Sequence, residues 1–127
     1  MLKLLCDRSS SKPLRVLCLG AHADDIEIGC GGTILRLTGQ RRKIECTWIV
    51  FSGSPTRRKE AETSAGRFLK GAARKQVQLH TFRDGYFPYN GADIKDCFEE
   101  LKRRCDPDLI FTHYRHDLHQ DHRLICE

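Results

Sequence analysis

The sequence predicts an α/β fold in which a mostly parallel sheet lies between two layers of helices. Four short apolar segments alternate with three amphipathic segments along the 127 residues, and turn-forming residues separate them. Strands that alternate with helices and are joined by right-handed crossovers form a Rossmann-like, three-layer domain. The commonest strand order for such a sheet, 3-2-1-4, places the first and fourth strands side by side.

The first half of the chain supplies two strands and two helices. Residues 15–20 (RVLCLG) form an apolar run that ends in glycine, as a buried parallel strand does. Residues 27–37 follow a helical spacing and end at a Thr-Gly-Gln turn. The second predicted strand is 43–51 (KIECTWIVF), and a helix follows over 56–72 with Thr56 as its expected N-cap.

The second half supplies two more strands around one helix. Residues 75–82 (KQVQLHTF) form the third predicted strand, and the turn-rich loop RDGYFPYNGAD after it is typical of loops that line sites. Residues 93–104 have apolar side chains at helical spacing, and the CDPD turn ends that helix. Residues 108–114 (DLIFTHY) form the fourth predicted strand.

Length and composition describe one globular domain. We expect residues 1–127 to form a single domain in which residues 1–13 are a loose leader, too briefly apolar for a signal peptide. The chain is 39% hydrophobic and 31% charged, and no apolar run approaches the roughly 18 residues that span a bilayer. These values exclude a membrane-spanning protein.

Charge and cysteine usage narrow the class of partner and the compartment. The net charge of +5 comes from basic clusters at predicted element ends without interleaved aromatic residues, which argues against a nucleic-acid partner. The seven cysteines contain no CxxC pair, and several lie inside apolar runs. This usage predicts buried free thiols and a cytoplasmic location.

Two polar loops are expected to face each other across one crevice. The stretch AHADDIEIGCGG (21–32) follows the first strand, and HYRHDLHQDH (113–122), which holds four of the six histidines, follows the fourth. In an open parallel sheet, ligands bind beyond the carboxyl ends of the strands where the strand order reverses. The first and fourth strands meet at that point, so we expect a site between these loops.

The glycines of the first loop do not indicate a phosphate site. A dinucleotide fingerprint needs G-x-G-x-x-G directly after the strand, where backbone amides meet the pyrophosphate. Here the glycines come about one helical turn later, and Asp24 and Asp25 would repel a phosphate. We expect instead that Gly29, Gly31 and Gly32 let the helix pack closely on the sheet or on the loop after the fourth strand.

The residue types of both loops favour a cation. His22 and Asp25 are of the kinds that bind Zn²⁺, and a catalytic zinc ion takes three protein ligands. The third would come from the far loop, whose candidates are His116, Asp117, His119, Asp121 and His122. Two plainer interpretations stay open: an aspartate pair before a helix is commonly an N-cap, and the far loop could be a polar surface loop.

Taken together, AHADDIEIGCGGTI and HDLHQDHR resemble the two motifs of the LmbE-like (PIG-L) family of zinc-dependent deacetylases. The family pattern is close to A-H-P-D-D-E/I-E-x-G-x-G-G-T followed by H-P-D-H, so Ala23 and Gln120 replace its usual prolines. The resemblance runs from about residue 15 to the C-terminus. It implies a Rossmann-like sheet and removal of an acyl group from a small-molecule or lipid-linked N-acetylglucosamine conjugate.

Carried over by position, the resemblance also implies a set of site residues. It implies one zinc ion per chain, held by His22, Asp25 and His122. It implies that Asp24 is the general base. His119, oriented by Asp121, would stabilise the oxyanion or protonate the leaving amine, and Arg57 would face the substrate.

Two alternatives to an active deacetylase follow from the same residues. Family members continue beyond LICE (124–127), which looks like the first turn of a helix, so we expect a C-terminally truncated domain. Such a domain could be a non-catalytic, metal-binding remnant, and its uncovered sheet edge would favour a homo-oligomer. A nucleotide-binding domain is the third hypothesis.

Overall fold

A four-stranded parallel sheet forms the centre of the computed structural model, which describes residues 11–40 and 43–127. The strand order is β3-β2-β1-β4, as the sequence predicts. The strands are β1 (Leu14–Gly20), β2 (Ile44–Ser52), β3 (Arg74–Phe82) and β4 (Leu109–Phe111).

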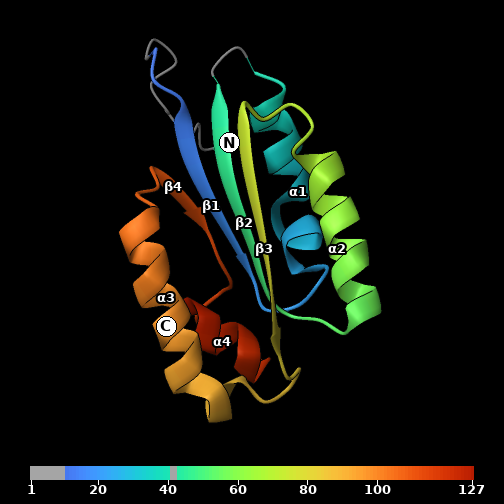
Figure 1. The fold of residues 1–127 in the computed structure, drawn as a ribbon, viewed down its shortest axis with the longest axis vertical. Helices are drawn as coiled ribbons and strands as arrows, with labels where there is room; N and C mark the ends of the chain where they lie inside the picture. The colour runs from blue at the N-terminus through green and yellow to red at the C-terminus, as the bar shows by residue number, and fades with distance from the viewer. Residues whose placement is uncertain (1–10, 41–42) are drawn as a thin grey trace.

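Helices cover both faces of this sheet, which confirms the predicted three-layer α/β architecture. Figure 1 shows α1 and α2 on one face and α3 with α4 on the other. The helices are α1 (Asp25–Thr38), α2 (Pro55–Phe68), α3 (Gly91–Arg104) and α4 (Gln120–Cys126), and a short 3-10 helix, η1 (Phe87–Asn90), precedes α3.

The alternation of side chains along β1 divides the core between the two faces. Val16 and Cys18 pack with Trp48 on the α1 and α2 side, whereas Leu17 and Leu19 pack on the side of α3 and α4. Successive residues of a strand point to opposite faces. Both faces are covered, which explains why β1 has an almost continuous apolar sequence rather than an alternating one.

Several element boundaries differ from the sequence prediction, and the helix predicted over 56–72 ends at Phe68. The Ser54 hydroxyl accepts a hydrogen bond from the Arg57 amide at 3.3 Å, so Ser54 and not Thr56 caps α2, with Pro55 in the first position. The strand predicted over 108–114 is only three residues long, and it lies at the edge of the sheet, where it pairs with β1. The last helix begins at Gln120, before the LICE segment.

Of the three glycines after β1 that were expected to permit close packing, only Gly31 does so, and the element it packs against is not the one expected. A Cβ at Gly31 would lie 2.6 Å from a ring carbon of Phe68, so the close approach is to α2 and not to the sheet or the loop after β4. A Cβ at Gly29 or Gly32 would meet open space. Of these three glycines, Gly31 alone is therefore required by packing.

Several sequence expectations lie partly outside the described residues. These include most of the predicted leader, the basic pair at 41–42 and Cys6. The other six cysteines are free, but among them only Cys18 and Cys46 are buried. In the described part of the chain, no helix is long and apolar enough to cross a bilayer.

Candidate metal centre

Side chains from the segments that follow β1, β3 and β4 meet at the carboxyl edge of the sheet. His22 and Asp25 follow β1, and His122 lies in α4, after β4. Nδ1 of His22 lies 3.2 Å from Nε2 of His122, so the predicted convergence of these two loops is observed. Asp84 arrives from the loop after β3, with a carboxylate oxygen 3.1 Å from Nε2 of His22.

Three side chains form a group with the spacing of metal ligands. Asp25 lies 3.4 Å from Nδ1 of His22 through one oxygen and 3.4 Å from Nε2 of His122 through the other. Ligand atoms held tetrahedrally at 2.0–2.2 Å from zinc are about 3.3–3.6 Å apart. The donor set of His22, Asp25 and His122 therefore fits a zinc ion.

Each histidine of this group has a carboxylate on its other ring nitrogen. Asp117 lies 3.1 Å from Nδ1 of His122, and Asp121 lies 3.2 Å from Nε2 of His22. A carboxylate that accepts the proton of one ring nitrogen selects the tautomer whose other nitrogen has a free lone pair. The arrangement thus prepares Nδ1 of His22 and Nε2 of His122 as ligand atoms.

Asp121 is fully buried and is held by the loop after β3. Its two oxygens accept hydrogen bonds from the amides of Gly85 and Phe87, at 2.6 and 3.1 Å. This differs from the expected orientation of His119 by Asp121. The carboxylate contacts His22 instead, and the contact with His119 runs from the Asp121 backbone amide to Nδ1, at 3.2 Å, because His119 is the N-cap of α4.

A second group of possible ligands shares His22, together with Asp84, His119 and Asp121. Both oxygens of Asp121 already accept an amide hydrogen bond, and Asp84 is 73% exposed. In the first group, one oxygen of Asp25 accepts the His22 amide at 2.7 Å, and the other faces His122. The first group is therefore the better cation site, and the second orients it.

Asp24 and Arg57 form an ion pair beside the group. The Arg57 guanidinium lies 3.1 Å from Asp24 and 3.3 Å from Glu60, and all three side chains are half exposed. The charge of Asp24 and its hydrogen bond raise the pKa of Arg57. Asp24 occupies the N-cap position of α1, but its side chain makes no cap hydrogen bond. The N-cap interpretation therefore does not account for it.

Burial and neighbouring charges have opposite effects on the pKa values of His22 and Asp25. Burial alone would lower the pKa of His22, but Asp25, Asp121 and Asp84 outweigh burial and raise it to about 9. Burial would raise the pKa of Asp25, but its contacts with His113 and His22 hold it well below the ordinary value. The carboxylates around His22 therefore favour a positive charge at this position.

The PIG-L family, described as GlcNAc-PI de-N-acetylase, matches residues 17–127. The chain belongs to the PIG-L family. The uncharacterized deacetylase YaiS of Escherichia coli K12 is 28% identical over 128 residues, which cover 94% of this chain and 68% of YaiS. The chain is therefore a member of a deacetylase family.

Solved structures share the fold. The N,N'-diacetylchitobiose deacetylase of Pyrococcus horikoshii is 29% identical with a TM-score of 0.64, covering 87% of this chain and 46% of its own. The conserved protein TT1542 of Thermus thermophilus is 25% identical with a TM-score of 0.62, covering 89% and 52%. The A40926 pseudoaglycone deacetylase Dbv21, 18% identical with a TM-score of 0.64 and covering 91% and 57%, shows the fold alone. The chain spans about half the length of these structures.

Sequence reasoning missed two residues of this PIG-L site. His113 accepts a hydrogen bond from the Ala21 amide at 2.9 Å, and its ring stacks on His122 with centroids 4.0 Å apart. Its position in the sequence could have indicated it, because His113 comes soon after β4, just as His22 comes soon after β1. Asp84 lies in a loop recognised as typical of sites. His116 was a candidate ligand, but it contacts the Tyr114 ring and belongs to neither group.

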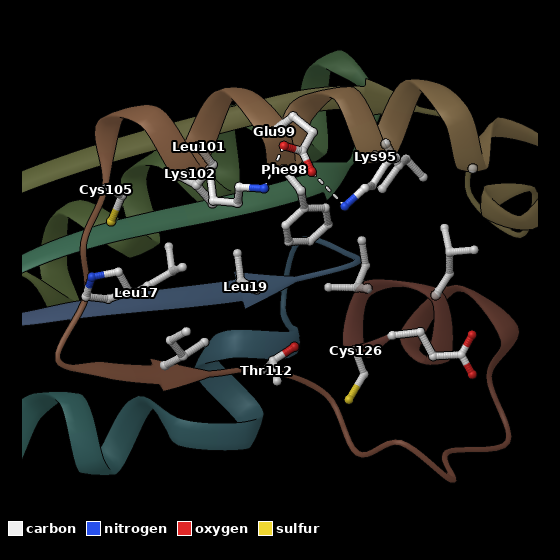
Figure 2. Close-up of a pocket in the computed structure, with 17 residues that line it drawn as sticks. Leu17, Leu19, Lys95, Phe98, Glu99, Leu101, Lys102, Cys105, Thr112 and Cys126 are labelled. Carbon is white, nitrogen blue, oxygen red and sulfur yellow. Dashed lines mark hydrogen bonds and ion pairs between the residues drawn. The ribbon is translucent and has the colours of Figure 1, made fainter.

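A large apolar cavity lies apart from the metal centre. Its volume is about 580 Å³, and its lining residues, from β1, α3, β4 and α4, include none of the candidate ligands. Figure 2 shows Phe98 of α3 pointing toward Leu19 of β1 across this space. A smaller cavity of about 260 Å³ between α1 and the end of β4 is lined by Asp25 and His113. The smaller cavity is the one that borders the metal centre.

Proposed function

We propose that this chain is a zinc-dependent deacetylase that hydrolyses the N-acetyl group of an N-acetylglucosamine conjugate. One observation carries the proposal: His22 and His122 meet Asp25 through one nitrogen each, while a carboxylate holds the other nitrogen of each ring. The printed names of the family and of the chitobiose deacetylase support an N-acetylated glucosamine as the substrate.

The ligands proposed for a single zinc ion are His22, Asp25 and His122. Two imidazole nitrogens and a carboxylate oxygen suit zinc and leave room for an exchangeable ligand. A zinc ion held there would polarise the amide carbonyl and acidify a water molecule. The reaction consumes one water and yields acetate and an amine.

Asp24 is the proposed general base. It lies next to the ligand Asp25 in the chain, and its carboxylate is half exposed, so it can reach a water molecule. The guanidinium of Arg57 lies 3.1 Å from this carboxylate, and this contact holds it beside the proposed ligands. Arg57 has further donors for a substrate oxygen.

His119 is proposed to stabilise the oxyanion or to protonate the leaving amine. Its Nδ1 accepts the amide hydrogen of Asp121, so Nε2 is the ring nitrogen that can donate a hydrogen bond or a proton to the substrate. The ring lies 4.8 Å from that of His22 and 4.6 Å from that of His122, centroid to centroid. It is therefore close enough to serve a substrate held between the ligands and Asp24.

Asp24→Asn tests the proposal because it separates chemistry from metal binding. We expect acetate release to fall by about 10²- to 10⁴-fold, since a general base is lost, while one zinc ion per chain is retained. Zinc content by elemental analysis and acetate by NMR measure the two effects. Glu60→Gln, which changes the other carboxylate on Arg57, is the matched control and should keep most of the activity.

Hydrolysis at the wild-type rate by Asp24→Asn would remove Asp24 from the mechanism. A wild-type chain that binds zinc without releasing acetate would instead be the non-catalytic, metal-binding alternative. The family implies a small-molecule substrate. A lipid-linked conjugate, a cytoplasmic location and a homo-oligomer stay predictions.

A further inference from the structure

We propose that Tyr86 and Tyr89 form an aglycone subsite, which stacks on a second ring of the substrate beyond the N-acetylated sugar. This inference rests on the proposed function and adds the kind of conjugate that the site accepts. It predicts a preference for conjugates whose neighbouring unit is itself a ring, such as a disaccharide, over the free monosaccharide.

The segment that carries both tyrosines is fixed to the metal centre. Asp84 contacts His22, and the amides of Gly85 and Phe87 donate to the buried carboxylate of Asp121. The Gln120 side chain donates a hydrogen bond to the Gly85 carbonyl. Figure 1 shows this connection between β3 and α3 passing beside α4. A ring on this segment therefore has a defined position relative to the ligands.

The two tyrosines face solvent, whereas the phenylalanine between them in the chain does not. Tyr86 is 41% exposed and Tyr89 is 81% exposed, while Phe87 is fully buried and lies against the His22 ring at 5.9 Å. Single exposed apolar side chains are common, but two adjacent aromatic rings at the rim of a site are a feature of binding surfaces. Burial of the core does not explain them.

The rings are also partly ordered before any ligand arrives. Their centroids are 5.9 Å apart and their planes are tilted by 48°. The guanidinium of Arg83 lies 3.7 Å from the centroid of Tyr86, so it covers one face of that ring. An immobilised ring loses little entropy when it binds, and a tyrosine presents an apolar face with a polar tip. A pyranose, with C–H groups on its faces and hydroxyls at its edge, matches both.

The position of the pair favours the second ring over the reacting sugar. The reacting acetamide must lie between the ligands and the Asp24–Arg57 pair. Asp84 and Phe87 contact His22 from this loop, whereas Tyr86, which lies between them in the chain, and Tyr89 are exposed to solvent. A unit attached to the reacting sugar would reach them from the outside.

The experiment compares binding of N,N'-diacetylchitobiose and N-acetylglucosamine to the full zinc-loaded chain by NMR titration. Asp24→Asn serves as the background, so that hydrolysis does not consume the ligands. Changing both Tyr86 and Tyr89 to Ala should weaken disaccharide binding about five- to tenfold and monosaccharide binding less than about twofold. Tyr86→Phe with Tyr89→Phe keeps the rings and should restore the preference.

Leu35→Ala is the control, because Leu35 is a 50% exposed apolar side chain of α1 that lies ten residues after Asp25, the first residue of that helix. An equal loss for both sugars, no loss for the disaccharide, or the same loss in Leu35→Ala would overturn the subsite. An octyl glycoside of N-acetylglucosamine tests whether the subsite requires a ring or only an apolar group. If the double alanine variant loses as much affinity for the octyl glycoside as for the disaccharide, the subsite does not require a ring, and the proposal is overturned. If the wild type binds both sugars without releasing acetate, the proposed function is overturned. The subsite is then decided by the ratio of disaccharide to monosaccharide affinity in the wild type and in the double alanine variant.

Discussion

The two nitrogens of His22 face surroundings with different functions. On the Nδ1 side, Asp25 and His122 are half-buried and point their ligand atoms at one position. On the Nε2 side, Asp121 is fully buried, and its carboxylate is already bound to two backbone amides. The Nδ1 side is suited to exchange a proton for a cation. The Nε2 side is suited to keep its hydrogen bonds unchanged when this happens.

This difference means that the segment HQDH contributes to both sides of His22. The segment HQDH supplies a proposed ligand, His122, and a carboxylate that contacts His22, Asp121, from adjacent positions of α4. Asp121 belongs functionally to His22, which lies 99 positions away in the chain. The motif therefore contacts the proposed ligand His22 through Asp121 and also supplies the second proposed histidine ligand, His122.

The largest effect is expected on the Nδ1 side. His122→Ala removes one of the three proposed ligands, so zinc affinity should fall by at least about 100-fold. His116→Ala is the control, because this histidine belongs to neither group and should bind zinc as the wild type does. Competition with a zinc-sensitive dye measures both. Equal affinities in the two variants would remove the Nδ1 side as the metal site.

A smaller effect is expected on the Nε2 side. Asp121→Asn keeps the shape but removes the charge that holds the Nε2 proton of His22, so zinc affinity should fall by about 10- to 100-fold. Asp117→Asn changes the equivalent carboxylate on His122, but that carboxylate is 34% exposed and should matter less. A larger loss in Asp117→Asn than in Asp121→Asn would contradict the contrast between a buried and an exposed orienting group.

The pH dependence of zinc binding tests whether a proton on His22 competes with the cation. The pKa of His22 is raised to about 9, so a metal-free chain at neutral pH must release about one proton when zinc binds. Affinity should therefore rise about tenfold per pH unit from 7 to 8 and level off above 9. In the metal-free chain the same shift stabilises the fold below about pH 6.5 and is lost as pH rises through 9. Calorimetry in two buffers counts the protons, and zero proton release at pH 7 would contradict this account.

The sequence predicts the Nδ1 side well and the Nε2 side poorly, for a physical reason. His22 and His122 follow neighbouring strands, and strand order can be inferred from the alternation of elements. Asp84 follows β3, which is at the opposite edge from β4, so no pattern of strands brings it to His22. It arrives because the connection to α3 is bound to Asp121, a contact that depends on side-chain packing.

Local boundaries show the same limit. Ser54 and Thr56 are equally good N-caps by residue type, and only the observed hydrogen bond decides for Ser54. Gly31 was correctly expected to permit close packing, but its partner Phe68 lies in another helix. Residue type and spacing therefore predict which positions matter, whereas the identity of a long-range partner requires the structure.

Histidine side-chain NMR during a zinc titration tests the central claim most directly. With ¹⁵N labelling, long-range ¹H–¹⁵N spectra distinguish the two nitrogens of each ring. We predict one zinc ion per chain, coordinated by Nδ1 of His22 and Nε2 of His122, with the proton of His22 retained on Nε2. Coordination through Nε2 of His22, or no zinc binding at micromolar concentration, would contradict this account.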